Sequence, residues 1–358
     1  MAKLLIIADI TPSSGLGHWM RCYNLSRSLQ VNNIDIHALR SPFMNSFDFF
    51  MPTDFIHWHS TTTELNHIEI AKLVEILNEA NQFDAILIDG YHFDATYRQQ
   101  LHNIGVQIIA YDDTNNCSNY HCDVLINANP NSKQLSYDKT APDAELLLGH
   151  QYRLFATEYY AANAQQVTKS NWSDRNCLTL IMGGGDSHSL TLPLLQTLIE
   201  LDWQDQVPEL HVVTTAMHAN HAMIHRWCER NRIQDMRIHV HHQMYNLAPL
   251  FTSSKLVISG AGGSAYELQM CATPAMLISL ADNQIATAIE AKKMGWADCW
   301  DWQENPDIAA LAKAIRSTWL DEQSLMSKHN KLTFDHKLFA QNNLSDELIN
   351  ILEVCTND

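Results

Sequence analysis

The side chain best suited to chemistry is a histidine close to the N-terminus. His18 ends a loop, residues 10–18, in which Gly15 and Gly17 let the backbone turn tightly and approach a ligand. The partial positive charge of a helix N-terminus favours a neutral imidazole, which accepts a proton from water at neutral pH. We therefore predict that His18 is a general base; the alternative is a turn histidine that only caps the helix.

Other polar side chains fall near the ends of predicted strands in the same half of the chain. Arg21 lies one helical turn after His18, where it would meet a phosphate or a substrate carbonyl. Tyr91 follows a predicted strand and offers a hydroxyl group that orients or protonates a ligand, although a plain glycine turn explains the same residues. Asp112 and Asp113 follow another strand and point to opposite sides. We expect one carboxylate to bind backbone and assign Asp113 to the substrate.

The second half of the chain carries glycine-rich loops instead. Residues 259–267, Ser-Gly-Ala-Gly-Gly-Ser-Ala-Tyr-Glu, run from a strand through a turn into a helix. Free N–H groups at Gly262 and Gly263, the helix dipole and the Ser264 hydroxyl hold a diphosphate without a lysine. Glu267 would bind the ribose hydroxyls, with a capping role as the alternative.

Three further positions complete the predicted ligand site of this half. Gly184 belongs to a triple-glycine loop, residues 182–186, which lacks the lysine of an ATP-binding P-loop. We expect Asp186, at the end of this loop, to cap the helix that follows. Asn283 and Gln284 start a helix, where their amides would bind sugar groups or act as an ordinary cap. Met244 lies in a loop that would cover a flat base.

A run of histidines at residues 239–242 resembles a metal site only superficially. His239 and His241 share a strand face, as metal ligands do. Nothing near them in the sequence supplies a spaced carboxylate or cysteine ligand pair. We therefore predict partly buried strand histidines, no metal site and no cofactor.

Composition and charge exclude several classes of partner. The 358 residues carry a net charge of −17, which disfavours nucleic acid and anionic membranes. Phosphates must then be held by local dipoles and a few cations. No apolar run approaches the roughly 18 residues of a membrane span, and residues 1–9 predict a first strand rather than a signal peptide. Eight cysteines without a Cys-x-x-Cys pair indicate buried, reduced thiols in a cytoplasmic protein.

Short apolar runs alternate with amphipathic stretches, which predicts parallel sheets covered by helices on both faces. The first series has strands at 4–8, 34–39, 85–89, 106–111, 124–127 and 146–148, and helices at 18–30, 65–81 and 94–103. The second has strands at 178–182, 210–214, 238–240, 256–259 and 275–279, and helices at 190–201, 219–230, 264–270 and 284–294. A polar stretch separates the two series. We predict an α/β chain with an N-terminal Rossmann-like domain at 1–160, a linker at 161–176 and a C-terminal Rossmann-like domain at 177–358, with ligand loops at the carboxyl ends of both sheets facing a cleft.

Taken together, the loops resemble one enzyme family. The matching elements, in order, are Gly15-x-Gly17-His18-x-x-Arg21, Asp89-x-Tyr91, Tyr111-Asp112-Asp113, Asp123-x-x-x-Asn127, Leu147-Leu148-Gly149-x-x-Tyr152, Met182-Gly183-Gly184-Gly185-Asp186, Gly262-Gly263-Ser264-x-x-Glu267 and Asn283-Gln284. This set, which runs to about residue 300, resembles the UDP-2,4-diacetamido-2,4,6-trideoxy-β-L-altropyranose hydrolases of bacterial pseudaminic acid (nonulosonic acid) synthesis. Those enzymes are similar to MurG-type glycosyltransferases and share their GT-B fold.

The resemblance implies specific roles. His18 would be the catalytic residue, and Tyr91 and Asn283 would position the sugar or the water. Gly262, Gly263 and Ser264 would bind the UDP phosphates, Glu267 the ribose, and Met244 would lie near uracil. Family members often carry Arg-x-Glu-Phe where this chain has Ala156-Thr157-Glu158-Tyr159, so an arginine contact is absent.

The expected reaction is hydrolysis of the anomeric C–O bond with inversion, releasing UDP and the free sugar. A GT-B glycosyltransferase using a UDP-sugar donor and a non-catalytic UDP-sugar-binding protein are the alternatives. We expect a small-molecule UDP-sugar as the partner, neither nucleic acid nor membrane, and a monomer or weak homodimer.

Overall fold

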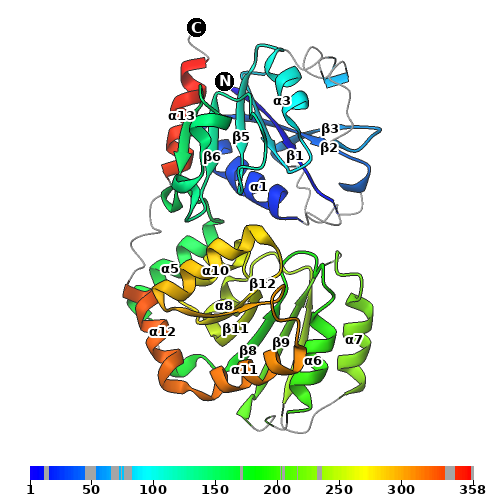
Figure 1. The fold of residues 1–358 in the computed structure, drawn as a ribbon, viewed down its shortest axis with the longest axis vertical. Coiled ribbons are helices and arrows are strands. Elements are labelled where there is room, and N and C mark those ends of the chain that lie inside the picture. The colour runs from blue at the N-terminus through cyan, green and yellow to red at the C-terminus, as the bar shows by residue number, and fades with distance from the viewer. Residues whose placement is uncertain are drawn as a thin grey trace. The chain divides into compact units, whose positions relative to one another are not determined.

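The computed structural model describes residues 1–11, 16–44, 54–65, 72–73, 75, 83–169, 172–201, 203, 206–215, 217–231, 236–334 and 343–355. The chain divides into two compact units. Unit 1 contains Met1–Leu154 together with Gln341–Asp358, and unit 2 contains Phe155–Ala340. Each unit is an α/β fold with its own parallel sheet (Figure 1).

Unit 1 is built on a seven-stranded sheet in which every described strand pair is parallel, in the order β3-β2-β1-β4-β5-β6-β7. The central strands are fully buried because runs of aliphatic residues face helices on both sides. The order reverses between β1 and β4, which creates the switch point where such folds bind ligands. The strands are β1 (Lys3–Ala8), β2 (Asp35–Arg40), β3 (Ile56–Ser60), β4 (Ala85–Asp89), β5 (Gln107–Tyr111), β6 (Val124–Asn127) and β7 (Glu145–Leu148).

The helices of unit 1 follow the expected pattern at its start and depart from it at its end. Helix α1 (Gly17–Gln30) buries a stripe formed by His18, Cys22, Leu25 and Leu29. Helix α3 (Ala95–His102) follows its N-cap Asp94, whose side chain accepts from the Tyr97 N–H. The short α4 (Tyr137–Thr140) follows β6. Most of the helix predicted at 65–81 lies outside the described residues.

Helix α13 (Asn343–Cys355) belongs to unit 1, although the sequence boundaries placed it in the C-terminal domain. It contacts α1, and the Ser28 and Ser345 hydroxyl groups lie 2.6 Å apart. Its buried face consists of leucines spaced at helical intervals, so the helix must cover an apolar surface. Figure 1 shows this helix, in red, against the elements of unit 1. The buried leucines are Leu344, Leu348 and Leu352.

Unit 2 has a six-stranded parallel sheet in the order β10-β9-β8-β11-β12-β13. Five of its strands match the predicted ones closely, and β13 was not predicted. The strands are β8 (Cys177–Ile181), β9 (Glu209–Thr214), β10 (Arg237–His242), β11 (Ser254–Gly260), β12 (Ala275–Ser279) and β13 (Ala297–Asp301). The helices are α5 (Thr157–Lys169), α6 (Thr191–Ile199), α7 (His221–Arg230), α8 (Ala248–Ser253), α9 (Gly263–Met270), α10 (Asp282–Met294), α11 (Ile308–Leu320) and α12 (Glu322–Phe334).

Helix α5 occupies much of the stretch predicted as a linker. Phe155, Tyr159 and Ala162 are buried in the core that also contains α8 and α9. The helix therefore anchors the start of unit 2 instead of forming a free connection. Because the outer face of this helix is polar, the spacing of its hydrophobic residues alone does not predict a helix.

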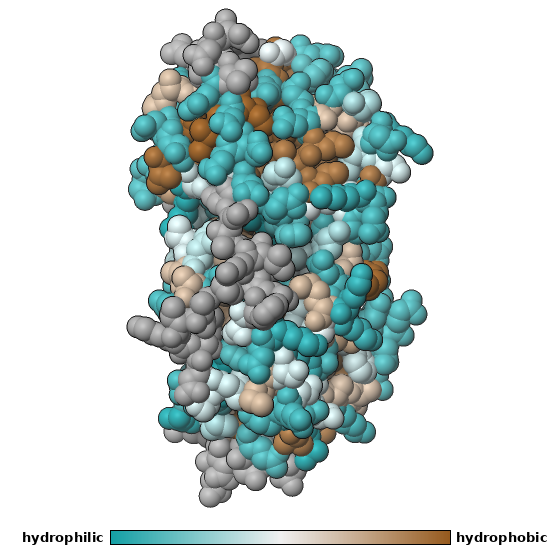
Figure 2. Space-filling view, turned by 90° about the vertical axis from the view of Figure 1, so that its left-hand side faces the viewer, coloured by the Kyte–Doolittle hydropathy of each residue, from teal (hydrophilic) through white to brown (hydrophobic). Residues whose placement is uncertain are grey.

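No described helix is both long and apolar enough to span a bilayer. The described cysteines are all free thiols, and most of them are buried. Hydrophilic residues cover most of the surface in Figure 2, and the hydrophobic residues visible there gather mainly in the upper part of the view.

Candidate functional site

The predicted histidine lies beside the carboxyl end of β4, at the switch point of the unit 1 sheet. His18, in the first turn of α1, is only 4% exposed, and its Nδ1 lies 2.6 Å from Oδ1 of Asp89, the last residue of β4. Asp89 is completely buried. A carboxylate held this close fixes the imidazole tautomer with the proton on Nδ1. Nε2 is then the nitrogen that can accept a proton.

Arg21 joins this pair to a second carboxylate. Its Nε lies 2.5 Å from Oδ2 of Asp89, its Nη2 lies 2.6 Å from Oδ1, and its Nη1 donates to Asp113 Oδ1 at 2.8 Å. The guanidinium also lies over the Tyr111 ring, 4.8 Å from its centroid. Two carboxylates thus already compensate the arginine charge, and its predicted contact with the substrate stays a prediction.

The charged groups of this cluster stay ionised because each lies in contact with an opposite charge. Burial alone would raise the pKa of Asp89, but Arg21 and His18 together hold it well below its usual value. The same balance, with Arg21 again the main partner, lowers the pKa of Asp113. Despite its burial, Arg21 has its pKa raised by the two carboxylates. The cluster therefore presents a carboxylate, not a carboxylic acid, to His18 at neutral pH.

Tyr91 completes the cluster from the loop after β4. Its hydroxyl donates to Asp113 Oδ2 at 2.8 Å, and its ring meets the His18 ring edge-on, with centroids 4.6 Å apart. With 37% of its surface exposed, Tyr91 is the accessible member of the group. The structure thus brings together four residues singled out in the sequence: His18, Arg21, Tyr91 and Asp113.

The two aspartates after β5 have different hydrogen-bond partners, as predicted. Asp112 accepts from the Asn115 N–H at 2.6 Å and from the Tyr137 hydroxyl, so it shapes its own loop. Asp113 points to the cluster, where Asn129 also donates to its Oδ1 at 3.1 Å. Alternation along the backbone separates a structural carboxylate from one in the site.

Sequence analysis gave Asp89 no role of its own, although it is the residue that orients His18. The sequence contained evidence for this role of Asp89, because an aspartate inside an otherwise aliphatic buried strand must have ionic partners. Asn129 carried no comparable signal. Gly15 lies outside the described residues, and Gly17 is the first residue of α1.

In unit 2, the glycine-rich turn after β11 leads directly into α9. Gly262 is the N-cap, and the first-turn N–H groups of Gly263 and Ser264 have no acceptor within the helix. A Cβ at Gly263 would meet no atom within 4 Å, so the approach to this backbone is open. A helix start of this kind stabilises an anion without a lysine.

The neighbouring α10 start lies against this turn. A Cβ at Gly262 would lie 3.9 Å from Nε2 of Gln284, whose Oε1 accepts from the Leu280 N–H at 3.0 Å. The Tyr266 and Thr287 hydroxyl groups, 2.8 Å apart, join α9 to α10. The structure therefore places Gln284 beside the Gly262–Ser264 turn, with Asn283 adjacent in the chain.

Other predicted residues of unit 2 occupy separate positions. Glu267 lies one turn into α9 near Tyr159, whose pKa is raised by burial and further by this carboxylate. Met244 is partly buried against the core near α8. Gly184 lies in the loop after β8, and its carbonyl accepts from the Thr215 hydroxyl.

Asp186 caps α6 as predicted, because its two oxygens accept from the Leu190 and Thr191 N–H groups at 2.8 and 2.9 Å. The loop that contains Gly184 is thus fixed at its end by a side chain. A ligand role for Gly184, Glu267 and Met244 remains a prediction.

Two doubly wound α/β units are the architecture of the GT-B fold, and the solved structures agree. MurG of Acinetobacter baumannii superposes with a TM-score of 0.63 over 98% of this chain and 99% of its own, at 14% identity. A spinosyn rhamnosyltransferase complexed with thymidine diphosphate gives 0.64 over 99% and 100%, also at 14% identity. At such identities these structures establish the fold alone.

Among curated proteins, the chain resembles the UDP-2,4-diacetamido-2,4,6-trideoxy-β-L-altropyranose hydrolase of Campylobacter jejuni. The two are 24% identical over 296 residues, which cover 82% of this chain and 97% of that enzyme. An uncharacterized protein of Methanocaldococcus jannaschii is 21% identical over 283 residues, covering 77% of this chain and 55% of its own length. No protein-family model matches the sequence.

Proposed function

We propose that this protein hydrolyses a UDP-linked 2,4-diacetamido-2,4,6-trideoxyhexose, with UDP-2,4-diacetamido-2,4,6-trideoxy-β-L-altropyranose as the substrate. The observation that carries the proposal is the 2.6 Å contact between His18 Nδ1 and the buried carboxylate of Asp89. The resemblance to the Campylobacter hydrolase supports the choice of substrate.

The proposed reaction is attack of water on the anomeric carbon. His18 Nε2 takes a proton from the water as its oxygen bonds to C1, and the bond between C1 and the diphosphate oxygen breaks. UDP leaves with that electron pair, and attack opposite the leaving group inverts C1. Asp89 stabilises the imidazolium that forms, as a buried carboxylate does beside other catalytic histidines. The products are UDP and 2,4-diacetamido-2,4,6-trideoxy-L-altrose.

The remaining residues bind and position the substrate. Tyr91 is exposed beside His18 and anchored on Asp113, which suits it to orient the sugar or the water. The N-terminus of α9, with Gly262, Gly263 and Ser264, would hold the diphosphate and stabilise charge on the departing group. We assign Glu267 to the ribose, Met244 to the uracil surroundings, Gly184 to the loop near the sugar or phosphates, and Asn283 and Gln284 to the sugar.

The test is to incubate the protein with the UDP-sugar and no acceptor, and to follow UDP by ³¹P NMR. We expect UDP release, and ¹H NMR of the first sugar product should show the inverted anomer. A glycosyltransferase, the class suggested by the structural neighbours, would release UDP appreciably only when an acceptor is added. A binding protein would give none. Absence of acceptor-independent release overturns the proposal.

Replacing His18 tests its role directly. His18→Ala should lower turnover by about 10²- to 10⁴-fold, the usual contribution of a positioned general base, while the Kd for UDP stays within a few-fold. His102→Ala, at an exposed histidine of α3 in the same unit, is the matched control and should keep full activity. An active His18→Ala variant would show that another group activates the water.

A further inference from the structure

A second group of chemically able side chains lies at the edge of the unit 2 sheet, on strands β9 and β10. Glu209 and His211 lie on the same face of β9, and His239 is the register partner of His211 on the edge strand β10. They lie toward the amino ends of these strands, whereas the proposed UDP-binding loops follow the carboxyl ends. This group is therefore separate from the residues assigned to the nucleotide.

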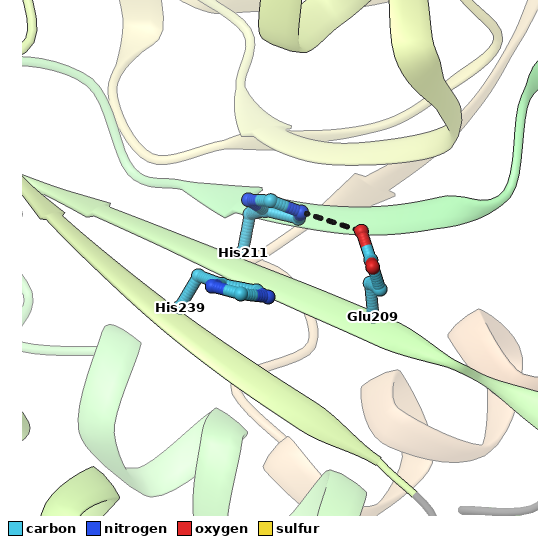
Figure 3. A group of neighbouring side chains, drawn as sticks. All are labelled: Glu209, His211 and His239. Carbon is cyan, nitrogen blue, oxygen red and sulfur yellow. Dashed lines mark ion pairs between the residues drawn. The ribbon is translucent and has the colours of Figure 1, made fainter.

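The three side chains converge on one volume. Their potential ligand atoms all lie within 4.8 Å of one another. The His211 and His239 rings stand nearly parallel with centroids 4.8 Å apart, and Glu209 extends toward them from its strand (Figure 3). A tetrahedral zinc ion at its usual bond lengths holds ligands roughly 3.3 Å apart. Side-chain rotations at this half-exposed edge, including rotation of the two rings out of their stacked arrangement, would bring the atoms to that spacing.

Neighbouring groups orient the ligand atoms in the way that metal sites require. Arg237 pairs with Oε1 of Glu209, which leaves Oε2 directed to His211 Nε2, 3.6 Å away. His211 Nδ1 lies 2.8 Å from Nε2 of His241, so in the tautomer with the proton on Nδ1 His211 donates to His241 and its Nε2 lone pair is open to a metal ion. Metal-binding histidines almost always donate their other ring nitrogen to such a partner.

We propose that Glu209, His211 and His239 bind a divalent transition-metal ion, with zinc the metal that two imidazoles and one carboxylate suit best. Water completes a tetrahedral coordination, and His241 and Arg237 hold the ligands in place. Because the ligands come from both strands, the ion fastens the edge strand β10 to β9.

The proposed site departs from the sequence-based expectation of no metal. His239 was correctly placed on a face with His241, but its partners were sought nearby in the sequence. Glu209 and His211 come from a strand almost 30 residues earlier, and only the parallel pairing of β9 with β10 brings them together.

Unit 1 provides a natural comparator at its own sheet edge. His37 Nδ1 lies 2.9 Å from His59 Nε2, as His211 does from His241. There, however, the two oxygens of Asp35 are divided between His37 Nε2, at 3.3 Å, and His57 Nε2, at 3.4 Å. The carboxylate itself bridges the two imidazoles, so we assign the metal to unit 2.

The experiment is equilibrium dialysis of the full chain against low-micromolar Zn²⁺, with bound metal measured by elemental analysis. We expect His239→Ala and His211→Ala each to remove one equivalent relative to the wild type. His241→Ala should weaken that binding by about 10- to 100-fold, the usual effect of losing such a supporting partner. A thermal-unfolding scan of each variant without zinc verifies that it folds.

Two matched controls locate the site. His242→Ala removes an exposed histidine on the opposite face of β10, and His57→Ala removes the exposed histidine of the unit 1 comparator. Both should retain the equivalent that His239→Ala loses. Zn²⁺ should raise the unfolding temperature of the wild type and both controls, but not of His239→Ala. Absence of bound zinc in the wild type, or zinc binding unchanged by His239→Ala, overturns the proposal.

Discussion

The carboxyl ends of the strands carry ion-paired side chains in unit 1 and uncovered glycine backbone in unit 2. Unit 1 gathers His18, Arg21, Asp89 and Asp113 into a buried network of ion pairs. Unit 2 offers open glycine backbone and the start of α9, where a Cβ at Gly263 would meet no atom within 4 Å. A proton acceptor needs a fixed tautomer, which side chains provide. Uncovered N–H groups at a helix start stabilise an anion without a lysine, which suits a chain of net charge −17.

The largest effect should come from breaking the unit 1 network at its centre. Asp89→Asn removes the group that orients His18 and leaves Arg21 with one buried partner fewer. We expect turnover to fall by about 10³- to 10⁴-fold and the free energy of unfolding to fall by about 3–5 kcal/mol. UDP-release assays and denaturant unfolding measure the two losses.

Asp113→Asn is the control for that variant, because it spares the contact between His18 and Asp89. Its turnover should fall far less, by about tenfold. Equal losses in the two variants would mean that the network acts as a general scaffold and that His18 has no special dependence on Asp89.

A smaller effect should separate the two units by ligand affinity. Gly263→Ala adds a methyl group without a clash in the protein, but it covers the backbone where the diphosphate would approach. Losing one charge-assisted hydrogen bond weakens UDP binding by about tenfold, which calorimetry measures. Gly17→Ala, equally free of clashes but in unit 1, should leave the UDP affinity unchanged. Equal affinities for UDP in both variants would remove the α9 turn from the nucleotide site.

The smallest expected effect is a loss of stability at acidic pH. Burial lowers the pKa of His218, next to the Gly184 loop, to about 4, and it also lowers that of His329. The unfolded chain binds protons near pH 6.5, whereas these histidines stay neutral in the folded chain at that pH. Their contribution to stability is therefore lost as the pH falls from 6.5 to 4. The lowered pKa values of Asp89 and Asp113 preserve their contribution until the pH falls below their ordinary value, 3.8.

Hydrogen exchange at pH 7 and pH 4.5 follows both regions in one sample. Amides around Thr215 and Gly184 should lose protection at pH 4.5, while those around Asp89 should keep theirs. Uniform loss across both regions would contradict this order, and His218→Asn should flatten the response around Thr215.

Much of this organisation was predictable, because it depends on local periodicity. The central strands and the amphipathic α1 follow from aliphatic runs and helical spacing. Asp186 as a cap and the division between Asp112 and Asp113 also follow from local rules. The GT-B fold was predicted from the alternating elements and the family resemblance.

What the sequence did not reveal depends on distant pairing. The role of Asp89 requires β1 and β4 to be neighbours, and the Glu209–His211–His239 group requires β9 to lie beside β10. Helix α5 has a polar outer face that resembles a linker. Helix α13 has clear leucine spacing, but its spacing carries no information about which unit it covers.

Helix α13 brings the end of the chain back to unit 1, and this limits where the protein can be cut into fragments. A fragment ending at Leu154 would lack Leu344, Leu348 and Leu352, and it would expose the surface of α1 that they cover. Anyone expressing the histidine-bearing half alone should join residues 343–355 to it through a new loop, or supply them as a separate peptide. The chain is one gene product with two cores, but its halves are not two consecutive pieces of sequence.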